Sequence, residues 1–389
     1  MSNWLFWELK HSVFGDHHGN KIFELWDYYD KDEPHHIQQW QQTGVEFYDK
    51  SKKVLLIHIN GYDCYDYDIR QHKEIVELMD DGYELIALGM TEPESFACME
   101  KSIPWLKKYG IKKIIDCSLK NKESDLFRKE GIDVLDDVVL LVSEIGYLTP
   151  VKNWIRFYND GFWEYAYHNQ YGYKRQHKIS FLHGLAHYGR KNFFDKLWDI
   201  NSKFNFESNW LAPIEYFEGS EDKQKYYKEI YPTIKDGGGD GRAMNLVKYY
   251  NSIIETFTMV YLNGENKYIT EKWVKTVLTM KPALFIGPDN IMKWLHDEGF
   301  SWGIEALYKN WREYDSIKIH GQTENRDNID IKIEKVLEGY SELISGENPE
   351  DDLWEMYGNN YHIYKHNLDN LFQNFIPRQI KKLQEFIDK

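Results

Sequence analysis

The sequence predicts an α/β protein of two domains, each a doubly wound parallel sheet, that face each other across a cleft. Three observations lead to this prediction. The chain has 389 residues, whereas a single hydrophobic core stops growing at roughly 250 to 300 residues. Short continuous apolar runs, which are typical of strands buried on both faces, alternate with helical patterns. The alternation starts again at Lys178, so the second half predicts a second sheet.

The first half predicts four strands with helices between them. Its clearest strand is 53–60, a continuous apolar run that ends at Gly61. The elements expected after it are a helix at 70–80, a strand at 83–89, a strand at 113–116, a helix at 123–130 and a strand at 138–143. The first 50 residues, which are rich in Trp, His and acidic groups, predict irregular structure with one helix at 37–42.

The second half predicts a similar series of elements. The segment 158–178 is crowded with polar and aromatic residues and shows no strong periodicity, so we expect the connection between the domains there. The elements expected after it are a strand at 178–184, a helix at 190–200, strands at 249–262 and 282–288, and amphipathic helices at 329–344 and 367–387. These patterns divide the chain into an N-terminal domain 1–170, a C-terminal domain 171–360 and a final helix 361–389 that packs back on the first domain.

Composition and charge favour a soluble cytoplasmic protein. The formal net charge is −15 and is spread over both halves, which argues against tight binding of DNA or RNA. The chain contains no apolar stretch of about 18 residues and no signal-peptide pattern, so we expect no membrane association. The three cysteines, Cys64, Cys98 and Cys117, form no CxxC pair and are expected to be reduced.

The most informative local signal is a helix start at Thr270-Glu271-Lys272. Thr270 is a suitable N-cap, and an apolar helical face follows it. A helix N-terminus offers free N–H groups and a positive dipole end to a diphosphate, and Lys272 or Lys275 would add charge. Glu271 would then turn to neutral hydroxyls such as a ribose diol. The alternative is an ordinary capped helix with its Glu and Lys in solvent.

Several segments in order resemble one known family. They are Glu255-Thr256, the T-E-K-x-x-K segment 270–275, the K-P-x-L-x-I-G-P segment 281–288 and a helix that ends in Gly299-Phe300. This pattern, over about residues 178–345, resembles glycosyltransferase-like proteins of phages and large DNA viruses. Those proteins are similar to the donor domain of α-1,3-fucosyltransferases, a GT-B fold of two Rossmann-like domains.

The resemblance implies roles for particular residues. Glu271 and Lys272 would hold the ribose and the pyrophosphate of a nucleotide-sugar, and Arg190 would be a second pyrophosphate contact. The residues implied in donor binding are Arg190, Glu255, Thr256, Thr270, Glu271, Lys272 and Lys275. The chain departs from the family at Thr276-Val277, where an aromatic residue and Pro are common, and at His183–His187, which replaces an Asn-Arg-Arg-Pro type of turn. These departures leave the donor sugar open.

The function expected on these grounds is an inverting, metal-independent glycosyltransferase, encoded by a phage and acting in the host cytoplasm. Its donor is a nucleotide-diphosphate sugar, it needs no cofactor or metal, and its acceptor is a glycan or a hydroxymethylated DNA base. A general base must deprotonate the acceptor hydroxyl. Acidic residues follow the first-half strands, and the expected base is Asp63, Asp66 or Glu94, with Glu92, Asp116 and Glu144 in similar positions.

Other functions stay open. Asp66 and Asp68 form an Asp-x-Asp pair, which in a metal-dependent GT-A enzyme would hold a divalent ion. His183 and His187 have the spacing of a metal pair on a helix, although cleft-lining groups are expected there. The Gly237–Gly241 run predicts a loop near the cleft. A non-catalytic module that binds nucleotide or carbohydrate is the alternative from another functional class.

Overall fold

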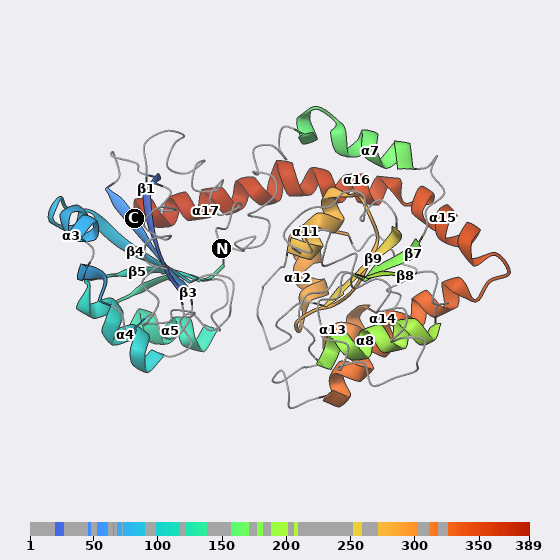
Figure 1. Cartoon of the computed structure of the whole chain (residues 1–389), viewed down its shortest axis with the longest axis horizontal. Helices are drawn as coiled ribbons and strands as arrows, with labels where there is room; N and C mark the ends of the chain where they lie inside the picture. The colour runs from blue at the N-terminus through green and yellow to red at the C-terminus, as the bar shows by residue number, and fades with distance from the viewer. Residues whose placement is uncertain are drawn as a thin grey trace. The chain divides into compact units, whose positions relative to one another are not determined.

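The computed structural model divides the chain into two compact units (Figure 1). Unit 1 consists of Met1–Ser143, Asn266–Tyr268 and Arg378–Lys389, and unit 2 consists of Glu144–Glu265 and Ile269–Pro377. The structure describes residues 20–26, 46–47, 53–60, 65, 68–71, 73–89, 99–116, 121–137, 157–170, 177–181, 188–200, 206–208, 252–258, 271–301, 311–317 and 326–389. Among the helices in these ranges, none is both long and apolar enough to span a bilayer.

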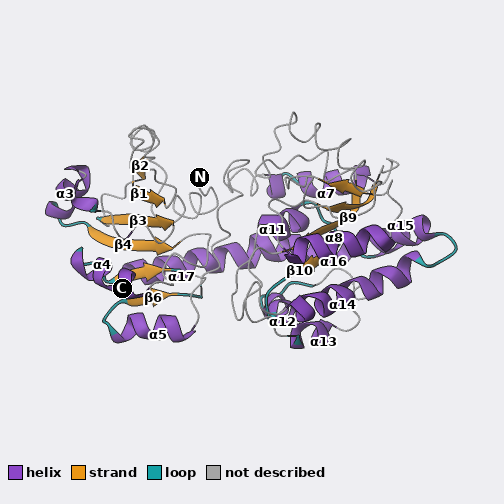
Figure 2. Ribbon diagram, turned by 60° about the horizontal axis from the view of Figure 1, so that its bottom comes forward, coloured by secondary structure: helices purple, strands orange, loops and turns teal. Residues whose placement is uncertain are grey.

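The described part of unit 1 contains a six-stranded sheet in the order β2-β1-β3-β4-β5-β6 (Figure 2). The strands are β1 (Asn20–Trp26), β2 (Glu46–Phe47), β3 (Val54–Asn60), β4 (Glu84–Gly89), β5 (Lys113–Ile115) and β6 (Asp133–Leu135). All neighbours are parallel except β2, which pairs with β1 in the antiparallel sense. The strands predicted at 53–60, 83–89 and 113–116 are confirmed. The predicted strand at 138–143 lies outside the described residues, and the strand that follows α5 is β6.

The expectation of irregular structure over the first 50 residues is wrong for β1. Its segment has no continuous apolar run, and its parallel partner β3 is distant in the chain. This segment is a strand because it pairs with β3, and a local sequence pattern does not reveal pairing with a remote strand. The helix expected at 37–42 lies outside the described residues.

In the described part of unit 1, the helices that connect the parallel strands cover one face of the sheet. They are α3 (Lys73–Asp80), α4 (Met99–Lys108) and α5 (Asn121–Lys129). One core joins them to the sheet through Ile75 of α3, Trp105 of α4 and Phe127 of α5. The described parallel strands lie in chain order, and right-handed crossovers in one direction place all connecting helices on one face. The prediction of a doubly wound sheet is therefore wrong for the described strands of unit 1.

The last helix, α17 (Ile376–Asp388), contributes to the opposite face of this sheet. Lys113 of β5 is 7% exposed, and its ammonium donates to the Ile387 carbonyl at 3.3 Å and pairs with Glu84 at 3.2 Å. Lys382 forms an ion pair with Asp137 at 2.8 Å. Phe386 and Ile387 are buried. The final turns of α17 thus cover the face of the sheet opposite to the one that α3, α4 and α5 cover.

Within its described ranges, unit 2 contains a four-stranded parallel sheet in the order β10-β9-β7-β8. Its strands are β7 (His177–Phe181), β8 (Phe206–Ser208), β9 (Ser252–Thr258) and β10 (Ala283–Ile286). All described residues of β9 and β10 are buried, which is the pattern expected of strands covered on both faces. The strands predicted at 178–184, 249–262 and 282–288 are confirmed.

Helices cover both faces of this sheet, as a doubly wound fold requires. They are α7 (Phe162–Gln170), α8 (Tyr188–Ile200), α11 (Glu271–Leu278), α12 (Ile291–Asp297), α13 (Trp311–Ser316), α14 (Arg326–Ile344), α15 (Pro349–Asn359) and α16 (Tyr361–Asn370). A π-helical turn, Leu371–Phe375, joins α16 to α17. In Figure 1, α11 and α16 lie on one side of the sheet, and α8, α13 and α14 lie on the other.

The expectation that 158–178 has no regular structure is wrong over α7. A polar network holds this helix against α16: Tyr361 donates to Glu164 at 2.8 Å, and Lys365 pairs with Glu164 at 3.2 Å. Burial, and then the hydrogen bond to Glu164, raises the pKa of Tyr361 to about 12, so its hydroxyl stays protonated and remains a donor at neutral pH. The apolar stripe of α7 is weak, and its contacts with α16 stabilise the helix.

Candidate functional site

The carboxyl edge of the unit 2 sheet includes a point where the strand order reverses. The chain passes from β7 to β8 on one side, and β9 then lies on the other side of β7, parallel to it. In open α/β sheets, ligands bind outside the carboxyl ends of the strands at such a reversal. The reversal lies between Phe181, which ends β7, and Thr258, which ends β9. We take this edge as the candidate site.

Two helices begin at the candidate site, one on each face of the sheet. α8 follows β7 and α11 follows β9, and their crossovers run in opposite directions across the sheet. Right-handed crossovers in opposite directions place the helices on opposite faces, as Figure 1 shows. Because each helix follows the carboxyl end of its strand, the free N–H groups of both helices lie at this edge. Such an arrangement suits an anionic ligand.

Three of the predicted donor-binding residues lie in the first turns of these helices. Arg190 is the third residue of α8, and Glu271 and Lys272 are the first two residues of α11. The fold therefore brings their backbones to one edge of one sheet. Their side chains, and the whole of Thr270, lie outside the described residues, and their contacts with a donor stay predictions.

The rest of α11 is held by apolar packing. Trp273, Val274, Val277 and Leu278 are buried, and the Trp273 ring meets Phe300 edge-on with centroids 4.5 Å apart. The Thr279 hydroxyl donates to the Lys275 carbonyl at 2.8 Å and closes the C-terminal turn. Lys275, also predicted as a diphosphate contact, is only 2% exposed. Its predicted role is untested.

Glu255, another predicted donor contact, belongs to a buried ion pair. Its Oε1 accepts hydrogen bonds from Lys281 Nζ and Ser252 Oγ, both at 3.1 Å. The Lys281 and Glu255 side chains are 0% and 3% exposed. Ser252 begins β9 and Lys281 precedes β10, so this pair lies toward the amino end of the strands, away from the candidate site. We assign Glu255 a role in joining the two strands, and its contact with a donor stays a prediction, as does that of the buried Thr256.

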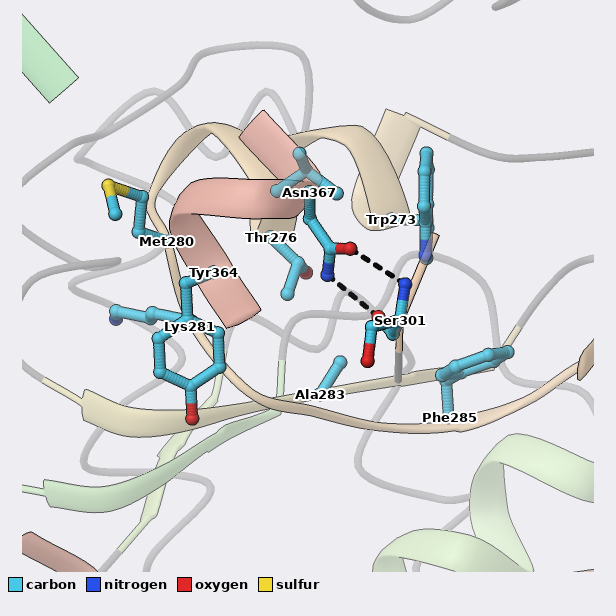
Figure 3. A pocket seen from close by; sticks show the side chains of 10 residues that line it. Trp273, Thr276, Met280, Lys281, Ala283, Phe285, Ser301, Tyr364 and Asn367 are labelled. Atoms are coloured by element: carbon cyan, nitrogen blue, oxygen red, sulfur yellow. Dashed lines mark hydrogen bonds between the residues drawn. The ribbon is translucent and has the colours of Figure 1, made fainter. Parts of the chain in front are cut away.

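A small cavity lies beside this ion pair (Figure 3). Its lining comes from α11, β10, α16 and the turn between α11 and β10, and it includes Thr276, Lys281 and Tyr364. Asn367 closes one side by donating to the Ser301 carbonyl at 2.7 Å and accepting from the Ser301 N–H at 2.8 Å. Because the lining consists of core elements, we assign the cavity to the interior of unit 2.

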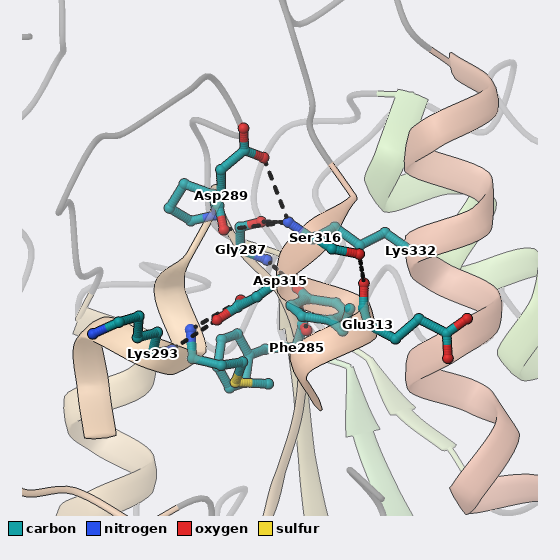
Figure 4. A network of polar contacts seen from close by, with 11 residues as sticks. Phe285, Gly287, Asp289, Lys293, Glu313, Asp315, Ser316 and Lys332 are labelled. Atoms are coloured by element: carbon teal, nitrogen blue, oxygen red, sulfur yellow. Dashed lines mark hydrogen bonds and ion pairs between the residues drawn. The ribbon is translucent and has the colours of Figure 1, made fainter. Parts of the chain in front are cut away.

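The loop from β10 to α12 is held by a lysine that sequence analysis missed (Figure 4). Lys332 of α14 donates to the carbonyls of Gly287 at 3.0 Å and Pro288 at 3.2 Å, and pairs with Asp289 at 3.8 Å. The side chain is 0% exposed, and its ammonium lies 4.6 Å from the Tyr314 ring centroid. The sequence contained a signal that this lysine is buried. Lys332 lies three residues after Ile329 and four before Val336, which places it on the apolar face of α14.

A carboxylate closes the N-terminus of α12. Asp315 of α13 accepts from the Met292 N–H at 3.2 Å and the Lys293 N–H at 2.7 Å. The Tyr314 hydroxyl accepts from the Gly287 N–H at 2.9 Å. The negative charge of Asp315 at the N-terminus of α12 repels a diphosphate. We therefore expect an anionic ligand to bind at the first turns of α8 and α11 instead.

Replacing Asp315 by alanine is expected to lower the free energy of unfolding by about 1 to 2 kcal/mol, the usual effect of losing a helix cap. The residue is 5% exposed, so water cannot readily replace the lost acceptor. Thermal unfolding measures the change. Asp297→Ala, which removes an exposed partner of Lys293 on α12, is the control and should change stability by less than about 0.5 kcal/mol. Equal losses in the two variants would contradict the capping role.

The predicted catalytic residues of the first half lie outside the described residues, namely Asp63, Asp66 and Glu94, as do Glu92 and Glu144. Asp116 is buried directly after β5. The histidines at 183 and 187 and the glycines at 237–241 also lie outside the described residues. Among the residues that are described, no three His, Cys, Asp or Glu side chains form a cluster suited to a metal.

Asp68, half of the Asp-x-Asp pair, joins the short 3-10 turn Ile69–Gln71 to α4. It accepts from the Tyr109 hydroxyl at 2.8 Å, the Arg70 N–H at 3.0 Å and Lys108 Nζ at 3.3 Å. The Tyr109 and Arg70 hydrogen bonds lower its pKa most, and Lys108 adds to the effect. A carboxylate already engaged by three donors fits a structural role better than the ligand of a divalent ion.

Comparison with known proteins leaves the family open. No family model matches the chain, and no curated protein matches its sequence. A solved structure with some similarity is a glycosyltransferase from Rickettsia africae ESF-5, with a TM-score of 0.28 and 10% sequence identity over 85% of this chain and 98% of that chain. A TM-score of this size does not establish a shared fold. The resemblance to viral and fucosyltransferase-like proteins stays a prediction.

Proposed function

We propose that the chain is a glycosyltransferase that moves a sugar from a nucleotide-diphosphate donor to an acceptor hydroxyl. The observation that carries this proposal is the strand-order reversal of unit 2, with the N-termini of α8 and α11 on its two sides. The N–H groups of both helices would hold the diphosphate, with Arg190 and Lys272 adding positive charge. Glu271 would accept hydrogen bonds from the ribose hydroxyls.

The proposed reaction is an inverting displacement without a metal. A carboxylate takes the proton of the acceptor hydroxyl, the acceptor oxygen attacks the anomeric carbon, and the nucleoside diphosphate leaves. Arg190, Lys272 and Lys275 would stabilise the charge on the leaving group, a task that a divalent ion performs in other enzymes. Asp63, Asp66 and Glu94 remain the candidates for the base. Full activity in the presence of a chelator would support this mechanism over the metal-dependent one.

The proposed acceptor is a glycan or a hydroxymethylated base of phage DNA. The sequence resemblance suggests a phage origin, and the net charge of −15 favours the glycan. Turnover of donor with each acceptor class distinguishes the two. Donor binding without turnover on any acceptor would favour the alternative of a non-catalytic binding module.

Replacing Lys272 or Glu271 by alanine is expected to weaken binding of the nucleoside diphosphate by about tenfold to a hundredfold. Each change removes a charge-assisted hydrogen bond, which contributes about 1.5 to 3 kcal/mol. Isothermal titration with uridine, guanosine, adenosine, cytidine and thymidine diphosphates measures the loss, and the melting temperature of each variant checks the fold.

Lys293→Ala is the matched control for Lys272. Lys293 is an exposed lysine near the start of α12, the helix whose N-terminus Asp315 closes. Its loss should leave nucleotide affinity unchanged. The proposal is wrong if the wild-type protein binds none of the nucleotides, or if the Lys272 and Lys293 variants bind them equally well.

A further inference from the structure

The side chain of Thr258 carries a buried hydroxyl that has no hydrogen-bond partner among the described residues. The residue is 2% exposed, and its Oγ1 is buried and forms no hydrogen bond with the part of the chain that the structure describes. Most buried polar groups in proteins are hydrogen-bonded, and leaving one unsatisfied destabilises the folded state. An unsatisfied hydroxyl in this position therefore needs an explanation.

Thr258 is located at the strand-order reversal. It is the last residue of β9 and pairs with Ile286, the last residue of β10, so it lies at the carboxyl edge where the candidate site is. Parallel sheets bind ligands at this edge. The buried ion pair of Glu255 lies toward the other end of the same strand and does not reach Thr258.

The alternation of side chains along β9 decides which face Thr258 occupies. Phe257 stacks on Phe285 with ring centroids 5.2 Å apart, and Phe285 lines the cavity under α11. Successive residues of a strand point to opposite faces, so Thr258 points to the face that α8 covers. The hydroxyl therefore lies on the same face and at the same edge as the first turn of α8, which carries Arg190.

We propose that Thr258 is a ligand-binding residue whose hydroxyl donates a hydrogen bond to a phosphate oxygen held at the first turn of α8. This inference rests on the proposed function and extends it to a residue that the sequence did not single out. A phosphate oxygen only accepts hydrogen bonds, so it matches an unused hydroxyl donor. The enclosed position strengthens such a bond, because little water competes for it.

The test compares Thr258→Val with Thr258→Ser by isothermal titration. Valine keeps the shape of the side chain and removes the hydroxyl, whereas serine keeps the hydroxyl and removes the methyl group. The probes are inorganic pyrophosphate and the five nucleoside diphosphates named above. We expect Thr258→Val to weaken binding by about tenfold or more and Thr258→Ser by less than about threefold. Without ligand, Thr258→Val should melt at the wild-type temperature or above it, because it removes an unsatisfied group.

Ser102→Ala is the matched control. Ser102 lies in α4 of unit 1, is fully buried, and its hydroxyl also lacks a hydrogen-bond partner in the described ranges. Its replacement removes the same kind of group away from the candidate site, and it should leave all affinities unchanged.

Two outcomes would overturn the role of Thr258. If Thr258→Val binds pyrophosphate and nucleotides as the wild type does, the hydroxyl contacts no ligand. The proposed function is then still supported, because the protein binds nucleotides. If Thr258→Ser loses as much affinity as Thr258→Val, the methyl group and its packing are responsible. Binding of pyrophosphate that depends on the hydroxyl, together with no binding of any nucleotide, would support the phosphate contact and refute the proposed function. If the wild type binds no probe at all, both are refuted.

Discussion

Replacing Lys332 by methionine lowers the free energy of unfolding of unit 2 by about 3 to 5 kcal/mol, the usual effect of breaking a buried ion pair. The methionine keeps most of the side-chain volume but removes the donor to the Gly287 and Pro288 carbonyls. It also leaves the buried carboxylate of Asp289 without this cation. For a unit of this size, the melting temperature should fall by about 2 to 4 °C per kcal/mol.

Lys335→Met, one turn further along α14, is the matched control. Lys335 is 27% exposed and pairs with Glu313 at 3.2 Å and Glu338 at 3.4 Å. Ion pairs near the surface contribute about 1 kcal/mol or less, so this variant should remain close to the wild type. Similar melting temperatures for the Lys332 and Lys335 variants would show that the contacts of Lys332 do not stabilise the loop.

Replacing Lys281 by methionine is expected to have an effect of similar size, about 3 to 5 kcal/mol, because the Glu255 carboxylate then loses its buried cation. Glu255→Gln should also destabilise the protein, since the Lys281 ammonium loses its negative partner. The double variant, with Met at 281 and Gln at 255, should lose less than the sum of the single losses, because neither charge is then left unpaired. Thermal unfolding of the four proteins measures this coupling.

The same variants separate the two roles of Glu255. If Glu255 only joins β9 to the start of β10, Glu255→Gln lowers the melting temperature and leaves the nucleotide affinity of the folded protein unchanged. A loss of affinity in Glu255→Gln at a temperature where the variant is folded would support the predicted donor contact. Simple addition of the two single losses would contradict the buried pair.

Local patterns predicted the elements that show a continuous apolar run or an apolar helical stripe. Strands β3 and β10 were found from continuous apolar runs, and α14 was found from its apolar stripe. The strand predictions succeeded because a strand buried on both faces must be apolar throughout. The helix prediction succeeded because one face of α14 is buried, at Ile329, Ile333 and Val336. Elements whose stability depends on distant partners were missed. β1 depends on β3, and α7 depends on its polar contacts with α16.

The family resemblance pointed to Arg190 at the start of α8 and the capping pattern pointed to the start of α11, whereas the buried groups around them required the structure. The apolar stripe of α14 included Lys332 without revealing that its ammonium reaches the loop after β10. Nothing near Thr258 in the sequence indicated a hydroxyl without a partner. A side chain's hydrogen bonds depend on what surrounds it in space, and residues far along the chain supply those surroundings.

By itself, the sequence determined that the protein is an α/β chain with two parallel sheets, because apolar runs and helical periodicity are local properties. Only the tertiary structure decided the strand order, which follows the chain in unit 1 and reverses between β7 and β9 in unit 2. Strand order depends on pairing between remote segments, and no short window of residues records that pairing. The reversal, in turn, decided which helix starts meet at one edge and where a donor site is proposed.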